Sequence, residues 1–146
     1  MATLKDIILA EGRRPLVVSD CVRLIDDEVS AKSGLTGLAV KGGYAIVKKI
    51  KPGIIPDAVE HMLDDFVDKL EPFYAEFLSQ GGAAIEPYFK RRDNEIANAL
   101  LGVTDSRAAR SSHNTLKKAY EKLRPTGIKH TAAAVPGLAR LIAKHT

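Results

Sequence analysis

Basic side chains gather in the second half of the chain, where their density suggests anion binding. Residues 81–146 carry twelve Lys or Arg and five Asp or Glu, whereas residues 56–80 carry one Lys and seven acids. About six to eight such basic charges can bind a phosphate backbone. The candidate anion-binding residues are Lys90, Arg91, Arg92, Arg107, Arg110, Lys117 and Lys118.

A helix predicted over residues 105–124 and capped by Thr104 or Asp105 would display most of these charges. Its apolar residues recur at helical spacing, so the Arg and Lys side chains fall on the opposite face. Ordinary surface helices share this pattern. The chain also has no Trp and only 5% aromatic residues, so side chains that could stack on bases are scarce. Nucleic-acid binding is therefore an alternative rather than the first choice.

Patterns typical of catalysis or metal binding are missing from the sequence. The four histidines are scattered, and no two are four residues apart as helical metal ligands would be. Ser111, Ser112 and His113 are adjacent, which on a helix points them in different directions. We therefore expect no catalytic residue, no metal and no cofactor, and we favour a non-enzymatic role.

The spacing Gly37-x-x-x-x-Gly42 resembles the start of a phosphate-binding loop. Such a loop continues with Lys and Ser or Thr, which contact the phosphates and magnesium. Here Gly43 and Tyr44 occupy those positions. Helix packing or a turn explains these glycines better than a nucleotide does.

Capping residues, prolines at helix starts and apolar spacings of three and four predict an all-α fold. We expect one helical domain over 1–146, built as a compact, irregular (orthogonal) bundle of six or seven helices. Beyond 105–124, the predicted helices are a short one after Thr3, then 15–33, 35–51, 56–80, 86–101 and 135–145.

Residues 35–51 can be read in two ways. The turn Lys41-Gly42-Gly43-Tyr44 would suit a β-hairpin. A lone hairpin is poorly stable, however, and Lys48-Lys49-Ile50-Lys51 before Pro52 resembles a helix C-terminus. Helix is favoured, with its glycines allowing close approach of neighbouring backbones.

Residues 56–80 give the clearest helical pattern, with apolar residues at helical spacing and acids between them. Leu63 and Phe66 are expected in the core, and Pro72 is expected to kink or break the helix near Glu71. The acids Asp64, Asp68 and Glu71 should face basic residues such as Lys90, Arg91 and Arg110 across a seam between helices.

The N-terminus lacks a signal-peptide pattern, since the apolar stretch from Ile7 to Ala10 is short and flanked by acids. No stretch reaches the roughly 18 apolar residues of a membrane span. Cys21, the single cysteine, cannot form an intrachain disulfide and is interpreted as a small buried apolar residue. These observations predict a cytoplasmic protein without membrane contact.

The runs Gly37 to Pro72, Ala119 to Pro125 and Val135 to Leu141 resemble a family of short, all-helical bacterial proteins with no assigned function. The resemblance covers most of the chain and implies no activity, cofactor or site residue. We therefore predict an interaction module, with a protein partner or a second copy of itself. The alternatives are a nucleic-acid or anion binder using the basic half, and a carrier of a small apolar ligand held between the Gly-rich and Met/Phe-bearing helices.

Overall fold

The computed structural model describes residues 3–81 and 84–146. Over these residues it contains eight α-helices, one 3-10 helix and no strand, which confirms the all-α prediction. The elements are α1 (Leu4–Ile8), α2 (Arg14–Ala31), α3 (Gly34–Ile50), α4 (Ile54–Ser79), α5 (Ile85–Arg91), α6 (Asp93–Ala109), α7 (Asn114–Leu123), η1 (Arg124–Thr126) and α8 (Gly127–His145). None of these helices combines the length and apolar character needed to cross a membrane.

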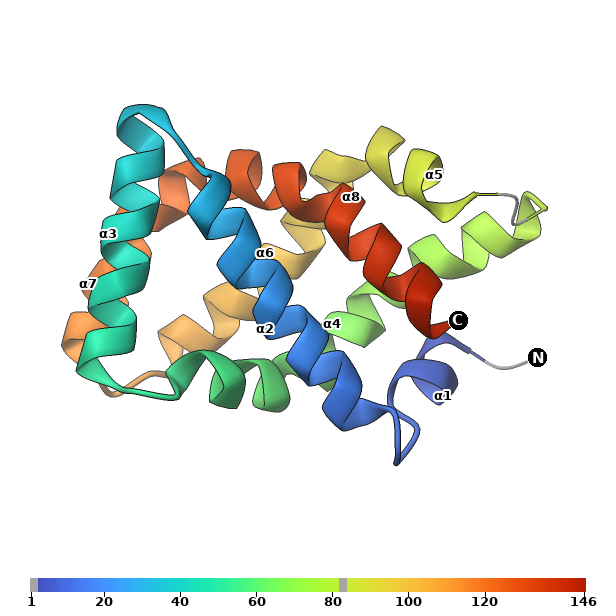
Figure 1. Cartoon of the computed structure of the whole chain (residues 1–146), viewed down its shortest axis with the longest axis horizontal. Coiled ribbons are helices and arrows are strands. Elements are labelled where there is room, and N and C mark those ends of the chain that lie inside the picture. Colours follow the sequence, from blue (N-terminus) through green and yellow to red (C-terminus); the bar gives the residue numbers. More distant parts are fainter. Residues whose placement is uncertain (1–2, 82–83) are drawn as a thin grey trace.

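The helices form a body and a separate pair at one end (Figure 1). In the body, α8 packs against α2, α5 and α6, and α4 packs against α1, α2 and α6. Helices α3 and α7 lie side by side at the end opposite α1 and the C-terminus. This α3–α7 pair joins the body through fewer contacts than the body helices share among themselves.

The apolar core belongs to the body. Its most deeply buried large side chains come from five different helices: Leu4, Val17, Phe89, Ile96 and Val135. Among the described residues, neither α3 nor α7 contributes to the buried apolar cluster. In α7 no residue is fully buried, so the pair covers the body rather than forming its centre.

The N-terminal helix is fixed to α4 by a carboxylate. Thr3 and Asp6 form the predicted cap, in which each side chain accepts from the main-chain amide of the other residue. The Glu71 carboxylate of α4 accepts from the amides of Leu4, at 3.0 Å, and Lys5, at 3.1 Å. First-turn amides have no partner within their own helix, so Glu71 completes α1 and attaches it to the body.

Replacing Glu71 by Ala should lower the free energy of unfolding by about 1–2 kcal/mol, because two amides lose a charged acceptor. Urea unfolding would measure the loss. Asp65→Ala, on an exposed face of the same helix, is the control and should change stability by less than about 0.5 kcal/mol. Equal effects of the two substitutions would contradict this role of Glu71.

Residues 34–50 are helical, which resolves the choice between helix and hairpin. Two of its glycines do permit a close approach: a Cβ on Gly43 would lie 3.0 Å from Leu123 of α7, and one on Gly37 would lie 2.8 Å from the Lys32 main chain. At Gly42 a Cβ would meet nothing within 4 Å. Gly43 therefore allows close packing of the Leu123 side chain of α7, Gly37 allows close approach of the Lys32 main chain, and Gly42 has no such role.

The predicted helix boundaries are wrong in the C-terminal half. The predicted helix 86–101 is divided at Arg92 into α5 and α6, and α6 continues through Gly102 to Ala109. Thr104 and Asp105 therefore lie inside α6 instead of capping a new helix. The break comes instead before Asn114, after the weak helix formers Ser111, Ser112 and His113.

Two prolines lie inside helices rather than at their ends. Helix α4 runs through Pro72 to Ser79 without the expected break, and α8 begins at Gly127 rather than near Pro136. An interior proline costs about 3 kcal/mol. Val135 and Ala139, on either side of Pro136, are buried, so packing on the body outweighs that cost.

Candidate ligand sites

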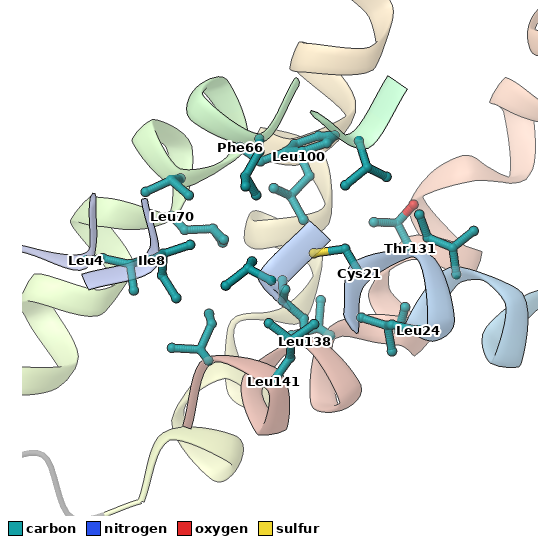
Figure 2. A pocket seen from close by; sticks show the side chains of 18 residues that line it. Leu4, Ile8, Cys21, Leu24, Phe66, Leu70, Leu100, Thr131, Leu138 and Leu141 are labelled. Carbon is teal, nitrogen blue, oxygen red and sulfur yellow. The ribbon is translucent and has the colours of Figure 1, made fainter. Parts of the chain in front are cut away.

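A pocket of about 160 Å³, partly open to the surface, lies in the middle of the body. Side chains of five helices line it, and nearly all are aliphatic or aromatic. Figure 2 shows the lining: Leu4, Ile8, Val17, Cys21, Leu24, Ile25, Val59, Leu63, Phe66, Val67, Leu70, Leu100, Thr131, Ala134, Val135, Leu138, Leu141 and Ile142. We call this space the central cavity.

Among the described residues that line it, the polar groups are the Thr131 hydroxyl and the Cys21 thiol. Burial raises the pKa of Cys21 to about 12, with a smaller contribution from the nearby Asp20 carboxylate. At neutral pH the thiol is therefore protonated and a poor nucleophile. Cys21 is half-buried and packs against the core, so it is an apolar packing residue, as interpreted from sequence, but it is not fully buried.

Leu63 and Phe66 differ in their burial. Leu63 is 3% exposed and belongs to the core, as predicted. Phe66 is only half-buried and contributes its ring to the wall of the central cavity (Figure 2). The expectation that Phe66 is a core residue is therefore wrong, because its ring lies at the partly open pocket and keeps part of its surface accessible.

A second hollow, of about 290 Å³, lies where the α3–α7 pair meets the body. Four helices and the loop after α6 supply its walls. The lining consists of Tyr44, Val47, Ile54, Ile55, Ala58, Met62, Thr104, Arg107, Ala108, Ser111, Leu116, Lys117, Tyr120 and Leu123. We call this space the α3–α7 groove. Two of the predicted anion-binding residues, Arg107 and Lys117, are among these lining residues.

The other predicted basic residues do not join them. Lys90 and Arg91 are exposed at the end of α5, on a different part of the chain from Arg110, which ends α6, and from the exposed Lys118 of α7. The expected single basic face over 105–124 is therefore wrong. The loop 111–113 divides it between two helices.

Arg92 is occupied by partners within the protein. Its guanidinium lies 2.5 Å from a Glu76 oxygen and 2.6 Å from a Glu95 oxygen, and donates to the Tyr88 hydroxyl at 2.9 Å. These bonds raise the pKa of Arg92, and the bond from Arg92 lowers the pKa of the Glu76 carboxyl. Arg92 therefore connects α4, α5 and α6 rather than facing an anion.

The acids of α4 contact the N-terminal helices instead of the predicted basic partners. Arg14 of α2 lies 2.6 Å from Asp64, and Lys5 of α1 lies 3.4 Å from Asp68. Glu71 is bound to the first-turn amides of α1. The ion pair between Arg92 and Glu76 joins residues 56–80 to residues 81–146. Neither residue was among those predicted to form the seam.

No group of three or more His, Cys, Asp and Glu residues suited to a metal ion occurs within residues 3–81 and 84–146. Ser111 accepts a hydrogen bond from the main-chain amide of His113, at 3.2 Å. That bond holds the loop before α7 and is not the imidazole contact that would activate a serine.

A polar cluster joins the end of α8 to the start of α2. The buried His145 ring lies 2.7 Å from an Asp20 oxygen through Nε2 and 3.1 Å from the Arg13 guanidinium through Nδ1. Because Arg can only donate, Nδ1 accepts and Nε2–H donates to Asp20. Hydrogen bonds from His145, then Lys144, lower the pKa of Asp20 below its ordinary 3.8.

Asp20→Asn should therefore destabilise the protein at neutral pH and lose its effect in acid. A carboxylate whose pKa is lower in the folded than in the unfolded protein stabilises the fold fully at pH values above its ordinary pKa. This stabilisation is lost as the pH falls through the pKa of the folded protein. Urea unfolding of both proteins across the range below pH 3.8 should show the two free energies converging. If the difference in free energy of unfolding between the two proteins stayed constant down to the lowest pH, the charge of Asp20 would not be the source of the stabilisation.

Comparison with known proteins identifies the family but no activity. Residues 4–146 match the family of unknown function DUF6918, so the chain belongs to that family. Searches of curated proteins and of solved structures gave no match. The resemblance seen in the sequence is thereby confirmed as membership of a family without an assigned function.

Proposed function

We propose that this protein binds a small apolar molecule in the central cavity, as a carrier or sensor acting in the cytoplasm. The observation that supports the proposal is a partly open pocket of about 160 Å³ in the middle of the body, lined almost entirely by apolar side chains. Close-packed interiors contain few voids larger than a water molecule. A pocket of this size, set among core residues and lined by apolar side chains, has the character of a ligand site.

The size and chemistry of the cavity define the ligand. A cavity of about 150 Å³ lined by Leu, Ile and Phe stays dry and accepts benzene. The central cavity has a similar volume, and Thr131 supplies its one hydroxyl. The expected ligand is thus an uncharged molecule about the size of one substituted ring or a short hydrocarbon chain.

Benzene is a suitable probe, because binding to the folded state alone raises the free energy of unfolding. At a concentration about 100 times its dissociation constant, the increase is about 2.7 kcal/mol. Ala134→Leu, which adds carbon atoms at a lining position of α8, should remove this increase. Ala143→Leu, on an exposed position of the same helix, should leave it unchanged.

Thermal unfolding with and without benzene would measure the effect in the three proteins. No stabilisation of the parent, or equal stabilisation of both variants, would contradict the proposal. Native mass spectrometry of protein purified from cells would then identify a retained natural ligand.

A second candidate function, self-association, is favoured by the outer face of α3. Leu35 is 88% exposed, Leu38 66% and Ile46 52%. Ala39, Gly42 and Ala45 are exposed between them and fall on the same side of the helix at spacings of three and four. This stripe of Leu35, Leu38, Ala39, Gly42, Ala45 and Ile46 is an unpartnered apolar surface, and we call it the α3 stripe.

The order of residues in the α3 stripe fits a second copy of the chain. Leu38 and Ile46 lie four residues on either side of Gly42, and Ala39 and Ala45 lie three. In an antiparallel pair related by a two-fold axis at Gly42, Leu38 would face the second copy's Ile46 and the small residues would meet at the crossing. A two-fold interface requires such self-complementarity.

Light scattering across a concentration series would test for the dimer. Gly42→Leu should weaken it without harming the monomer, because the new side chain starts in open space and suits a helix better than Gly does. Gly102→Leu is the matched control, since Gly102 is an exposed helical glycine with equal space. A monomeric parent at all concentrations, or equal weakening by both variants, would reject self-association.

A further inference from the structure

We propose that the α3–α7 groove binds an organic acid: an apolar tail lies along the groove and its carboxylate contacts Arg107 and Lys117. The groove differs from the central cavity in position, size and chemistry. It holds about 290 Å³ against about 160 Å³. It also has two basic side chains in its wall, and the central cavity has none.

The apolar side chains of the groove come mainly from α4, α3 and α7. Helix α4 supplies Ile54, Ile55, Ala58 and Met62, and the α3–α7 pair supplies Val47, Leu116 and Leu123. Met is unbranched and adapts its shape to neighbouring groups. An alkyl chain or an aromatic ring would bury its surface here as it does in other ligand pockets.

The polar part is positively charged. Arg107 and Lys117 are half-buried in the groove wall, and neither forms an ion pair with a described carboxylate. Neighbouring basic residues are paired: Arg124 lies 2.8 Å from Asp105, Lys48 lies 3.8 Å from Asp26, and Lys51 lies 4.0 Å from Asp57. Two cations held partly out of water without a counter-charge would gain strongly from an anionic ligand.

The start of α7 adds to the positive potential beside Lys117. No side chain caps this helix, and its first turn contains no acid. Free first-turn amides and the helix dipole both favour an anion at such an end. Leu116 and Lys117 lie in this turn and Ser111 precedes it, and all three line the groove.

The tyrosine hydroxyls in the groove are occupied, so they act as walls. Tyr44 donates to Asp26, and Tyr120 lies 2.5 Å from an Asp105 oxygen and 2.7 Å from the Thr104 hydroxyl. Burial, followed by the bond to the carboxylate, raises the pKa of both tyrosines. Both therefore remain uncharged at neutral pH, and the net charge at the groove wall comes from Arg107 and Lys117.

Calorimetric titration with octanoate, octan-1-ol and acetate tests each part of the proposal. Octanoate should bind more tightly than either of the others, because only octanoate has both the tail and the charge. Arg107→Gln and Lys117→Gln should each weaken octanoate binding by about tenfold, the loss of one charge-assisted contact. Binding of octan-1-ol should stay within about twofold of the parent in both variants.

Arg110→Gln and Lys118→Gln are matched controls, since each removes one charge from an exposed position near a groove residue. They should leave octanoate binding within about twofold of the parent. Equal losses in all four variants, or octan-1-ol binding as tightly as octanoate, would overturn the proposal. So would acetate binding as tightly as octanoate.

Ala58→Phe gives a second measurement that does not depend on charge. The added ring occupies the apolar wall of the groove and should abolish octanoate binding while leaving the benzene response of the central cavity intact. Unchanged octanoate binding in this variant would place the acid elsewhere and reject the groove. Because benzene and octanoate report on separate sites, either proposal can fail without the other.

Discussion

Replacing Phe89 by Ala should lower the free energy of unfolding by about 3–5 kcal/mol, the range for a large aromatic side chain removed from a close-packed core. Phe89 is completely buried, and its ring centroid lies 6.1 Å from that of Tyr88. It is carried by the seven-residue helix α5, which packs mainly against α8. So short a helix depends on tertiary packing for its stability, and removing Phe89 should release it.

Urea unfolding with parent and variant at equal concentration would measure this loss. Lys90→Ala, at the next position and exposed, is the control and should change stability by less than about 0.5 kcal/mol. A loss below about 1 kcal/mol for Phe89→Ala would mean that α5 is not part of the cooperative core.

The second large effect is expected at Leu63, where substitution by Ala should cost about 2–5 kcal/mol. Leu63 is 3% exposed and also lines the central cavity, so the truncation enlarges a space that already exists. Saturating benzene should therefore recover more stability in Leu63→Ala than in the parent. Phe66→Ala should cost less than Leu63→Ala, because Phe66 is half-buried beside that space.

That order reverses what side-chain size alone would predict. Thermal and urea unfolding of the two variants, each with and without benzene, would establish it. A larger loss for Phe66→Ala, or no added recovery by benzene in Leu63→Ala, would show that the region around Phe66 is filled in solution.

Fold class could be predicted from sequence because its signals are local. The Thr3–Asp6 cap, Pro15 near the start of α2 and the apolar spacing of α4 each act within a few residues. The predicted helix boundaries were wrong where tertiary packing outweighs the local preference of the residues. Gly102 and Pro136 lie inside helices whose neighbouring residues, such as Leu101 and Val135, are buried against the body.

The candidate sites could be predicted only in part. The sequence pattern selected Arg107 and Lys117 among seven basic residues but could not separate them from Arg92, whose carboxylate partners include Glu76 on another helix. The walls of the α3–α7 groove come from Tyr44 to Leu123, and no short motif spans that distance. The central cavity depends on how the helices pack together. The identities of the apolar residues that line it therefore do not reveal it in the sequence.

The division into a body and an end pair also has a consequence for how the molecule opens. Because no side chain of α7 is fully buried and α3 lies outside the apolar core cluster, amide protons of this pair should exchange with solvent through a local opening of low free energy. Amides of α4, α6 and α8 should exchange only on global unfolding. Such an opening removes two walls of the α3–α7 groove and none of the central cavity, so the two sites would belong to different cooperative units.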